Sequence, residues 1–343
     1  MRDAREVAVV GVTGYTGLEL ARILLRHPAV KAATFYVRET QGAKCLGEMF
    51  PQFRGWGEAP VRPLTAEAIA SSAAGTAFLA TPHEASAELA PKLLDAGLRV
   101  VDLSGAFRFA SAEIFTRWYK LAAPHAARLG EAVYGIPELY GEQIKDARLV
   151  ANPGCYATSV ILALRPLTDA GWIAEASSVV ADCKSGASGA GKEPRRDLHF
   201  VELDENFKAY NVFAHRHTPE ILEQTGLEEG QLVFTTHLLP LTRGILSTIY
   251  VTLGERRTAE DIEALYRKFY AGRPMVRIWA AGALPELQHV AHSNFCDLGF
   301  ALAEDGRRLV IVSCLDNLGK GAAGQAVQNF NLLLGLEEQT GLQ

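Results

Sequence analysis

A cysteine stands where an apolar segment gives way to a helix-like one. Residues 149–151 predict a strand, and residues 156–167 have the apolar spacing of a helix. The turn between them is Asn152-Pro153-Gly154-Cys155, in which Pro and Gly hold the cysteine at the rim of the core. The N–H groups at a helix start favour the thiolate, which is the reactive form of cysteine. Cys155 is therefore a candidate nucleophile, and the alternative is a buried cysteine that only packs.

Two histidines form a second candidate group. His215 and His217 lie just before Thr218 and Pro219, which are typical of an N-cap and of a first helical residue. Side chains two positions apart on an extended segment point the same way, and a helix N-terminus disfavours the imidazolium form. The pair therefore predicts a neutral base near pH 7, with a plain helix entry as the alternative. A zinc site is disfavoured because neither HExxH nor a cysteine cluster accompanies the pair.

A glycine turn follows the first apolar segment. Residues 6–10 predict a strand, residues 18–26 have helical spacing, and Gly11, Gly14 and Gly17 lie between them. Glycine lets main-chain N–H groups approach a pyrophosphate, and the helix dipole favours that anion. The turn predicts a dinucleotide site. Because the usual spacing is Gly-x-Gly-x-x-Gly, an ordinary strand-to-helix turn is the alternative.

The end of the second apolar segment bears on the choice of dinucleotide. Residues 33–37 are followed by Arg38 and Glu39. An acidic residue at this place holds the ribose 2′-hydroxyl of NAD, whereas an arginine meets the 2′-phosphate of NADP. Arg38 comes first, so we expect NADP(H). A role for Glu39 with NAD, or two solvated side chains, remain the alternatives.

Strands and helices alternate through the first half of the chain. Residues 76–80 and 99–103 predict strands, with a helix over 84–95 between them, and this order predicts a parallel, doubly wound sheet. Ligands lie beyond the carboxyl ends of such strands, where Ser104 and Arg108 are expected. Arg108 could bind an anion through two donors, and a surface ion pair is the alternative.

The second half predicts a mixed α+β layer. A strand over 177–183 runs into a Gly/Ser loop over 184–192, whose main-chain donors could hold phosphate or the nicotinamide side of a dinucleotide, unless it is a flexible linker. Apolar segments within 231–253, 294–303 and 307–314 predict antiparallel strands, with a helix over 258–270. A final helix over 319–335 has many small residues and is expected to return to the nucleotide domain.

Composition narrows the class of protein. The chain has 343 residues, 48% of them hydrophobic and 21% charged, and a net charge of -5, which disfavours a broad surface for nucleic acid or an anionic membrane. No stretch reaches the roughly 18 apolar residues of a membrane span, and the start of the chain lacks a leader pattern. Five cysteines without close pairing argue against disulfides and metal sites. We therefore expect a cytoplasmic protein.

Taken in order, these motifs resemble the N-acetyl-γ-glutamyl-phosphate reductases, the arginine-pathway members of the aspartate-semialdehyde dehydrogenase-like superfamily. Three departures from the family pattern are evident. Ser159 stands where Gly or Ala is usual, Gly105-Ala106 where Ala-Asp is usual, and Lys192 where Arg is common. The motifs that carry the resemblance cover nearly the whole chain: Gly11-Val12-Thr13-Gly14-Tyr15-Thr16-Gly17, Asp102-Leu103-Ser104, Phe107-Arg108, Tyr134-Gly135-Ile136-Pro137-Glu138, Asn152-Pro153-Gly154-Cys155-Tyr156, Ser185-Gly186-Ala187-Ser188-Gly189, Asn206-Phe207-Lys208-Ala209-Tyr210, His215-Arg216-His217-Thr218-Pro219-Glu220 and Asp316-Asn317-Leu318-Gly319.

The resemblance implies an architecture and a set of site residues. An NADP-binding Rossmann domain would span 1–151 and be completed by the C-terminal helix 316–343, and a catalytic and oligomerisation domain would span 152–315 of a homodimer or homotetramer. The implied catalytic residues are Cys155, His217 and His215, the implied cofactor residues are Gly11, Thr13, Gly14, Tyr15, Thr16, Gly17, Arg38, Ser185, Gly186, Ser188, Gly189 and Asn317, and the implied substrate residues are Ser104, Arg108, Asn152 and Glu220.

The resemblance also implies a reaction. Cys155 would attack the acyl phosphate of N-acetyl-L-glutamyl 5-phosphate and leave a thioester, which hydride from NADPH would reduce to the semialdehyde. His217 would move the proton, with His215 as the alternative. Rival interpretations are the same chemistry on aspartyl phosphate or on a carrier-bound aminoadipyl phosphate, and a non-catalytic NADP sensor whose cysteine is unreactive.

Overall fold

The computed structural model describes residues 2–56, 59–123 and 126–342, and it contains two compact units. One unit is formed by Met1–Pro153 with Ala322–Gln343, and the other by Gly154–Gly321. The predicted first domain ends at 151 and resumes at 316, so its boundaries differ. The segment 316–321 stays with the second unit, where the Asn317 side chain is bonded to Gly244 and Ser188. Met1 and Gln343, the predicted outer bounds, lie outside the described residues.

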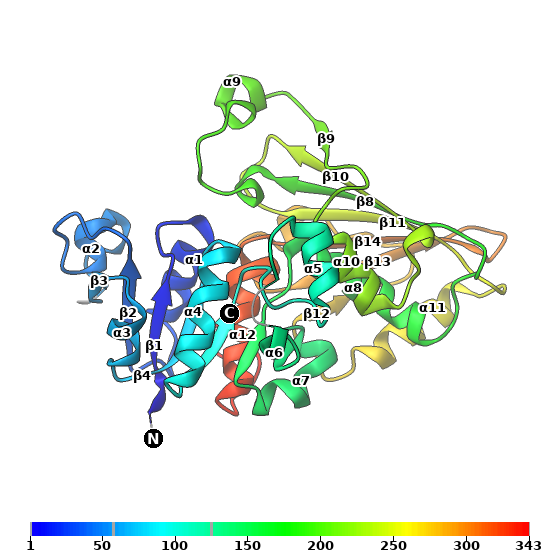
Figure 1. Ribbon diagram of the computed structural model, residues 1–343. Coiled ribbons are helices and arrows are strands. Elements are labelled where there is room, and N and C mark those ends of the chain that lie inside the picture. Colours follow the sequence, from blue (N-terminus) through cyan, green and yellow to red (C-terminus); the bar gives the residue numbers. More distant parts are fainter. Residues whose placement is uncertain (1, 57–58, 124–125, 343) are drawn as a thin grey trace. The chain divides into compact units, whose positions relative to one another are not determined.

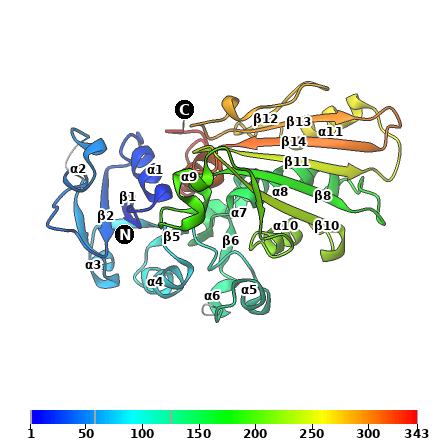
Figure 2. The same cartoon turned by 90° about the horizontal axis from the view of Figure 1, so that it is seen from above.

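The first unit is built on a seven-stranded sheet in the order β3-β2-β1-β4-β5-β7-β6. Every neighbouring pair is parallel. Helices lie on both sides of this sheet, as α1 and α4 show in Figure 2. The expected doubly wound parallel sheet is therefore confirmed. Its strands are β1 (Asp3–Val10), β2 (Ala32–Val37), β3 (Val61–Pro63), β4 (Ala74–Leu79), β5 (Arg99–Asp102), β6 (Ala132–Tyr134) and β7 (Leu149–Ala151).

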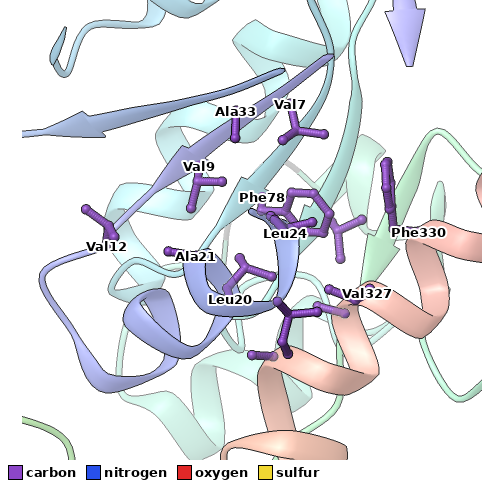
Figure 3. Close-up of a cluster of buried hydrophobic side chains, with 14 of the residues drawn as sticks. Val7, Val9, Val12, Leu20, Ala21, Leu24, Ala33, Phe78, Val327 and Phe330 are labelled. Atoms are coloured by element: carbon purple, nitrogen blue, oxygen red, sulfur yellow. The ribbon is translucent and has the colours of Figure 1, made fainter. Parts of the chain in front are cut away.

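Both faces of the first sheet are buried, and successive residues of β1 serve opposite faces. Val7 and Val9 pack with Phe78 against α1 (Tyr15–Leu24) and α12 (Gly324–Leu333), as Figure 3 shows. Ala8 and Val10 face the other cluster, which includes α4 (His83–Asp95). Phe330 of α12 meets Phe78 edge to face at a centroid distance of 5.3 Å. The C-terminal helix thus returns to the nucleotide-type sheet as expected.

The second unit is built on a mixed seven-stranded sheet in the order β12-β13-β14-β11-β8-β10-β9, whose long strands are labelled in Figure 1. The pairs β8–β10 and β12–β13 are parallel and the others are antiparallel. Burial alternates along β10 and β11, so one face is buried and the other is half-exposed. The strands are β8 (Val179–Gly186), β9 (Lys208–Tyr210), β10 (Leu232–Leu239), β11 (Ile245–Thr252), β12 (Val276–Ile278), β13 (Cys296–Leu302) and β14 (Arg308–Leu315).

The buried face of the second sheet packs on α8 (Cys155–Asp169). Ser159 of α8 exchanges hydrogen bonds with Ser247 of β11 at 2.8 Å and with Ser313 of β14 at 2.9 Å. Helix α11 (Ala259–Phe269) lies on α8 in turn, where the Tyr266 hydroxyl donates to the Ala163 carbonyl at 2.5 Å. These contacts fix the helix that begins at Cys155.

The remaining elements are short, and two sequence expectations about helix ends need correction. His217, not Thr218, is the N-cap of α10, and the helix expected over 319–335 begins as the π-helix η6 before α12. No helix among the described residues has the length and apolarity needed to cross a membrane. The other elements are α2 (Leu46–Met49), η1 (Pro51–Phe53), α3 (Ala66–Ala70), α5 (Ala112–Tyr119), α6 (Ala126–Leu129), α7 (Pro137–Asp146), η2 (Ala187–Ala190), η3 (Arg196–Leu198), α9 (Phe200–Leu203), α10 (Thr218–Thr225), η4 (Glu229–Gln231), η5 (Leu287–His289) and η6 (Gly319–Ala323).

Candidate active site

Cys155 is the first residue of α8, as the sequence predicts. Gly154 is the N-cap, with extended backbone at φ -72° and ψ 148°, and no side chain caps the helix. Cys155 is half-buried and is not in a disulfide. The first-turn N–H groups of α8 and its dipole therefore act on the thiol and stabilise negative charge there.

A histidine and a glutamate from α10 meet the glycine beside Cys155. The Gly154 N–H donates to Glu220 Oε2 at 3.0 Å, and Glu220 Oε1 lies 4.0 Å from His217 Nε2. The Glu220 side chain is fully buried. A Cβ on Gly154 would overlap the His217 imidazole, so glycine leaves the space that this ring occupies. The structure thus places two residues that are far away in the sequence, His217 and Glu220, against the glycine next to Cys155.

His215 lies against His217 and accepts a hydrogen bond from its main chain. The segment over 211–217 is a series of turns, which corrects the expectation of an extended strand. The His217 N–H donates to His215 Nδ1 at 3.1 Å, and the two rings are 4.6 Å apart. Burial lowers the pKa of His215 to about 2, and the nearby His217 and Arg216 add to this effect. His215 is therefore neutral at pH 7, with Nδ1 as an acceptor and Nε2 carrying the proton.

Several aromatic side chains surround His215, and the sequence did not predict them as its neighbours. Tyr156 and Phe234 meet its ring edge to face at 5.5 Å and 5.3 Å. The Tyr210 hydroxyl donates to the Tyr156 hydroxyl at 3.3 Å, which itself donates to the His237 carbonyl at 2.9 Å. Burial raises the pKa of Tyr210 to about 12, so it stays protonated. The only sequence signal for this enclosure is that Tyr156 and Tyr210 belong to the recognised motifs.

The glycine turn of the first unit joins β1 to α1. Gly11 has φ +91°, and a Cβ there would overlap the Ala80 carbonyl. A Cβ on Gly17 would overlap the Gly11 carbonyl, so both glycines are required by the main chain. At Gly14 the nearest atom to a Cβ would be 3.7 Å away. Space at Gly14 and the uncapped start of α1 fit a pyrophosphate.

Other predicted cofactor residues lie in the turn between β1 and α1, directly after β2, and in the loops of the second unit. Thr13, Tyr15 and Arg38 are exposed, with Arg38 directly after β2. In the second unit the N–H groups of Gly186, Ala187 and Ser188 donate to the carbonyls of Gly244, Leu241 and Thr242. The Gly/Ser loop is therefore a braced 3₁₀ turn, not a flexible linker, and these donors are already used. Asn317 joins the same two loops: its side chain donates to Ser188 Oγ at 2.9 Å and accepts from the Gly244 N–H at 2.8 Å.

Arg108 is buried, which excludes the surface ion pair considered from the sequence. Its Nε donates to the Asn152 carbonyl at 2.8 Å and its Nη2 to the Leu103 carbonyl at 3.0 Å. Ser104 donates through its N–H and its hydroxyl to Asp102, at 3.1 Å and 2.8 Å. Burial raises the pKa of Asp102, against the effect of these hydrogen bonds. The loop after β5 thus presents Arg108 in one orientation.

The structure explains the unusual glycine of this loop. A Cβ on Gly105 would overlap the Tyr119 hydroxyl, so the alanine usual in the family does not fit beside this tyrosine. Tyr119 stacks on Phe115 at 4.7 Å and meets His83 edge to face at 4.7 Å. His83 Nδ1 accepts from the Gly105 N–H at 2.8 Å. Gly105 therefore leaves the space that Tyr119 occupies, and Tyr119 packs with Phe115 and His83 beside this loop.

Within the described ranges, no group of three or more His, Cys, Asp or Glu residues could hold a metal ion. None of the five cysteines is in a disulfide. Burial raises the pKa of Cys183 to about 12, and that of Cys314 also rises with burial. These two cysteines lack the environment of a reactive thiol, whereas Cys155 stands at a helix N-terminus.

Comparison with known proteins gives a consistent result. The semialdehyde dehydrogenase NAD-binding domain family matches residues 6–147, and the semialdehyde dehydrogenase dimerisation domain family matches residues 155–317. The N-acetyl-gamma-glutamyl-phosphate reductase of Desulfotalea psychrophila is 44% identical, over 98% of both chains. That of Symbiobacterium thermophilum is 45% identical, over 98% of this chain and 97% of its own.

Solved structures with similar folds are more distant in sequence. Aspartate semialdehyde dehydrogenase II of Vibrio cholerae, complexed with ASA, has a TM-score of 0.73 at 18% identity and covers 96% of this chain and 98% of its own. Aspartate semialdehyde dehydrogenase of Candida albicans, with NADP, has a TM-score of 0.68 at 13% identity and covers 97% of this chain and 99% of its own. These likenesses show a shared fold.

Proposed function

The chain belongs to the family of N-acetyl-γ-glutamyl-phosphate reductases, and from this premise we propose that it reduces N-acetyl-L-glutamyl 5-phosphate to N-acetyl-L-glutamate 5-semialdehyde with NADPH, in arginine biosynthesis. The family makes it an oxidoreductase of amino-acid biosynthesis with a nicotinamide dinucleotide domain. The observation that carries the finer proposal is the packing of the His217 imidazole and the Glu220 carboxylate against the glycine that precedes Cys155.

Cys155 is the proposed nucleophile. Its sulfur attacks the acyl carbon, the bond to phosphate breaks, and a thioester remains on Cys155, so that one difficult step becomes two easier ones. The first-turn N–H groups of α8 stabilise the charge that develops on the carbonyl oxygen. When bound, NADPH supplies the hydride that reduces the thioester carbon. The carbon–sulfur bond then breaks while the hydroxyl proton passes to His217, which releases the semialdehyde and restores the Cys155 thiolate.

His217 is the proposed proton carrier. Its Nε2 faces Gly154, where it can accept the thiol proton of Cys155 and return a proton to the carbonyl oxygen. Glu220 lies 4.0 Å from that nitrogen and stabilises the imidazolium that forms. His215 is the less suitable acid/base group because its pKa of about 2 leaves it neutral throughout. We assign His215 the task of orienting His217 through the hydrogen bond to the His217 N–H.

Arg108 is the proposed anion-binding residue of the first unit. Its guanidinium is held by two main-chain carbonyls, which orients it for a phosphate or a carboxylate. The Ser104 hydroxyl is already bonded to Asp102 and to the Ala106 N–H, so we assign it a bracing role. The NADP assignment is supported by the space at Gly14, by the uncapped start of α1 and by Arg38 after β2.

The half-exposed face of the second sheet is the proposed self-association surface. Leu246 and Tyr250 of β11 and Val233 of β10 lie at half-buried or exposed positions of this face, although they are apolar or aromatic. The match to a dimerisation domain family supports a homodimer or homotetramer. Sedimentation should show a species larger than one chain at micromolar concentration, and a single-chain species alone would remove this assignment.

The test of the proposed function is the reverse reaction. Purified protein should reduce NADP in a phosphate-dependent manner with N-acetyl-L-glutamate 5-semialdehyde, and Cys155→Ser should abolish this turnover. Aspartate semialdehyde serves as the alternative substrate, and turnover with it alone would move the activity to another pathway. The absence of turnover with both would contradict the proposal. NAD in place of NADP, with wild type and Arg38→Ser, tests the dinucleotide preference.

A further inference from the structure

Helix α12 carries four amide side chains that are completely buried. Phe330 and Val327 pack on the first sheet, as Figure 3 shows, whereas Gln325, Gln328, Asn329 and Asn331 are all 0% exposed. Burying an amide without a hydrogen-bond partner is unfavourable, so the partners of these four groups are informative. The partners divide the four amides into two pairs.

Gln325 and Asn329 share one acceptor. Gln325 Nε2 and Asn329 Nδ2 donate to the Gly135 carbonyl at 3.0 Å and 2.9 Å. The Gly135 N–H donates to Ala151 at the end of β7, at 2.8 Å. A Cβ on Gly135 would lie 2.6 Å from Asn329 Nδ2, so residue 135 is glycine to let this amide approach. The Tyr134-Gly135-Ile136-Pro137-Glu138 motif, to which the sequence assigned no role, is thus where α12 docks.

Asn329 also reaches the residue that begins the cysteine turn. Asn329 Nδ2 donates to Asn152 Oδ1 at 3.0 Å, and Asn152 Nδ2 donates to the Ala322 carbonyl at 3.1 Å. The Asn152 N–H donates to the Asp102 carbonyl at 2.8 Å. The amide of Asn152 is therefore fixed at both its oxygen and its nitrogen. Its main-chain carbonyl accepts from Arg108 Nε at 2.8 Å, so the network continues to the guanidinium.

The other pair of amides serves the C-terminal tail. Gln328 Nε2 donates to Glu138 Oε1 at 2.9 Å and to Glu338 Oε2 at 2.8 Å. Asn331 donates to the Glu338 and Thr340 carbonyls, at 3.0 Å and 2.9 Å. Asn331 Oδ1 also lies 2.9 Å from His27 Nε2, so the hydrogen bonds of Asn331 go to groups other than Asn152 and Arg108. Asn331 is therefore a control in the same helix: it is a buried amide whose loss should affect stability without disturbing Asn152.

We infer that Gln325 and Asn329 are positioning residues, which hold Asn152 and, through its carbonyl, orient the Arg108 guanidinium for the substrate anion. This inference rests on the proposed function in its assignment of Arg108. Apolar side chains of similar size would fill the same space, but they would leave Asn152 Oδ1 without the Asn329 donor. The amide nitrogens of Gln325 and Asn329 are bonded in this network, whereas Gln325 Oε1 and Asn329 Oδ1 are buried without a hydrogen-bond partner among the described residues, so the nitrogens alone join α12 to Gly135 and Asn152. Asn152 is followed directly by Pro153, Gly154 and Cys155, so the same network fixes the start of the cysteine turn.

The test compares Asn329→Leu with Asn331→Leu. Both substitutions remove a buried amide from α12 and should lower Tm. Only Asn329→Leu should raise KM for inorganic phosphate in the reverse reaction, by about tenfold, because misplacement of a binding group by about 1 Å has effects of this size or larger. Equal changes in KM for the two variants would overturn the inference. So would an additive effect of Asn329→Leu in an Arg108→Met background, since residues that act through one another are not additive.

A readout that needs no substrate separates this inference from the proposed function. Hydrogen–deuterium exchange of the segment 149–153 should accelerate in Asn329→Leu and stay at the wild-type rate in Asn331→Leu. If wild type fails to turn over either semialdehyde, the proposed function fails while the exchange comparison still decides whether Asn329 holds Asn152. Unchanged exchange in Asn329→Leu would overturn the inference even in a fully active enzyme.

Discussion

At the turn from β1 to α1 glycine makes room for main chain, whereas at the turn from β7 to α8 it makes room for an imidazole. A Cβ on Gly11 or Gly17 would overlap a carbonyl oxygen, and Gly14 alone is open. A Cβ on Gly154 would overlap His217, and the Gly154 N–H is already bonded to Glu220. Both turns lead into helix N-termini without a side-chain cap. The first leaves open space beside Gly14, and the second brings residues distant in sequence against Gly154, next to Cys155.

This difference shows what a glycine motif can predict and what it cannot. Glycine spacing near a strand end shows that main chain must come close, and a dipole at the helix start then favours any anion. It does not show which side chains will converge on the turn. Residues 217 and 220, which pack against Gly154 beside Cys155, are the N-cap and an early residue of α10. The substitutions that follow should therefore act on different kinetic constants at the two turns.

Gly154→Ala should have the largest effect. The new methyl group would occupy the position of His217 Nε2, so the imidazole must move away from the turn. We expect kcat to fall by about 100-fold or more, with KM for NADP unchanged because the β1–α1 turn is untouched. Steady-state kinetics of the reverse reaction measures both constants. A variant with wild-type kcat would show that the position of His217 does not matter for turnover.

Gly14→Ala should act on cofactor binding instead. A methyl group at Gly14 has no atom closer than 3.7 Å, so the fold should tolerate it while a pyrophosphate could no longer approach as closely. We expect KM for NADP to rise by about tenfold, which corresponds to about 1.4 kcal/mol, with little change in Tm.

Gly17→Ala is the matched control for that variant. A methyl group at Gly17 would overlap the Gly11 carbonyl, so this variant should lose stability rather than cofactor affinity alone. Thermal unfolding measured beside the KM for NADP separates the two outcomes. If Gly14→Ala instead lost stability and kept its KM for NADP, the glycine turn would have no role in cofactor binding.

His215→Asn should change the pH dependence of stability. The pKa of His215 is about 2 in the folded chain, against an ordinary value of 6.5, so the unfolded chain binds more protons between these pH values. The free energy of unfolding contributed by His215 is thus constant above about pH 6.5 and falls below it, by up to about 1.4 kcal/mol per pH unit. Asparagine offers an acceptor to the His217 N–H but does not titrate.

Urea unfolding from pH 7 to pH 4 measures this slope. The variant should lose stability less steeply than wild type as the pH falls, and a uniform offset above pH 6.5 would reflect lost packing. His27, whose pKa is lowered mainly by burial, contributes in the same direction in both proteins and is not affected by the substitution. Parallel curves for the two proteins would contradict the assignment of a neutral, buried His215.

Ser159→Ala should have the smallest effect. The Ser159 hydroxyl joins α8 to Ser247 and Ser313 of the second sheet, four residues after Cys155. Its loss should lower the free energy of unfolding by about 1 kcal/mol and leave kcat unchanged, since the hydroxyl is bonded to the second sheet and not to the cysteine turn. Denaturant unfolding and kinetics test this. A large fall in kcat would contradict this expectation and would show that the Ser159 hydroxyl is needed to position the start of α8.

Much of the fold could be predicted because hydrophobic periodicity and strand–helix alternation are local signals. The parallel strands of the first sheet and Cys155 at a helix start follow from them. Long-range pairing could not be predicted. Polar residues such as Gln325 and Asn329 are normally expected on an exposed helix face, yet both are fully buried because partners from β6, β7 and their loops meet them. The reason for Gly105 is equally remote, since Tyr119 occupies the space beside it.

The central claim is that Cys155 carries the acyl group, and a reaction without phosphate tests it most directly. Protein mixed with NADP and N-acetyl-L-glutamate 5-semialdehyde should form a thioester that only slow hydrolysis can remove. We predict a burst of one NADPH for each chain, and peptide mass spectrometry should find the N-acetylglutamyl group on Cys155. Steady NADPH formation without a burst, or an acyl group on another residue, would contradict the account.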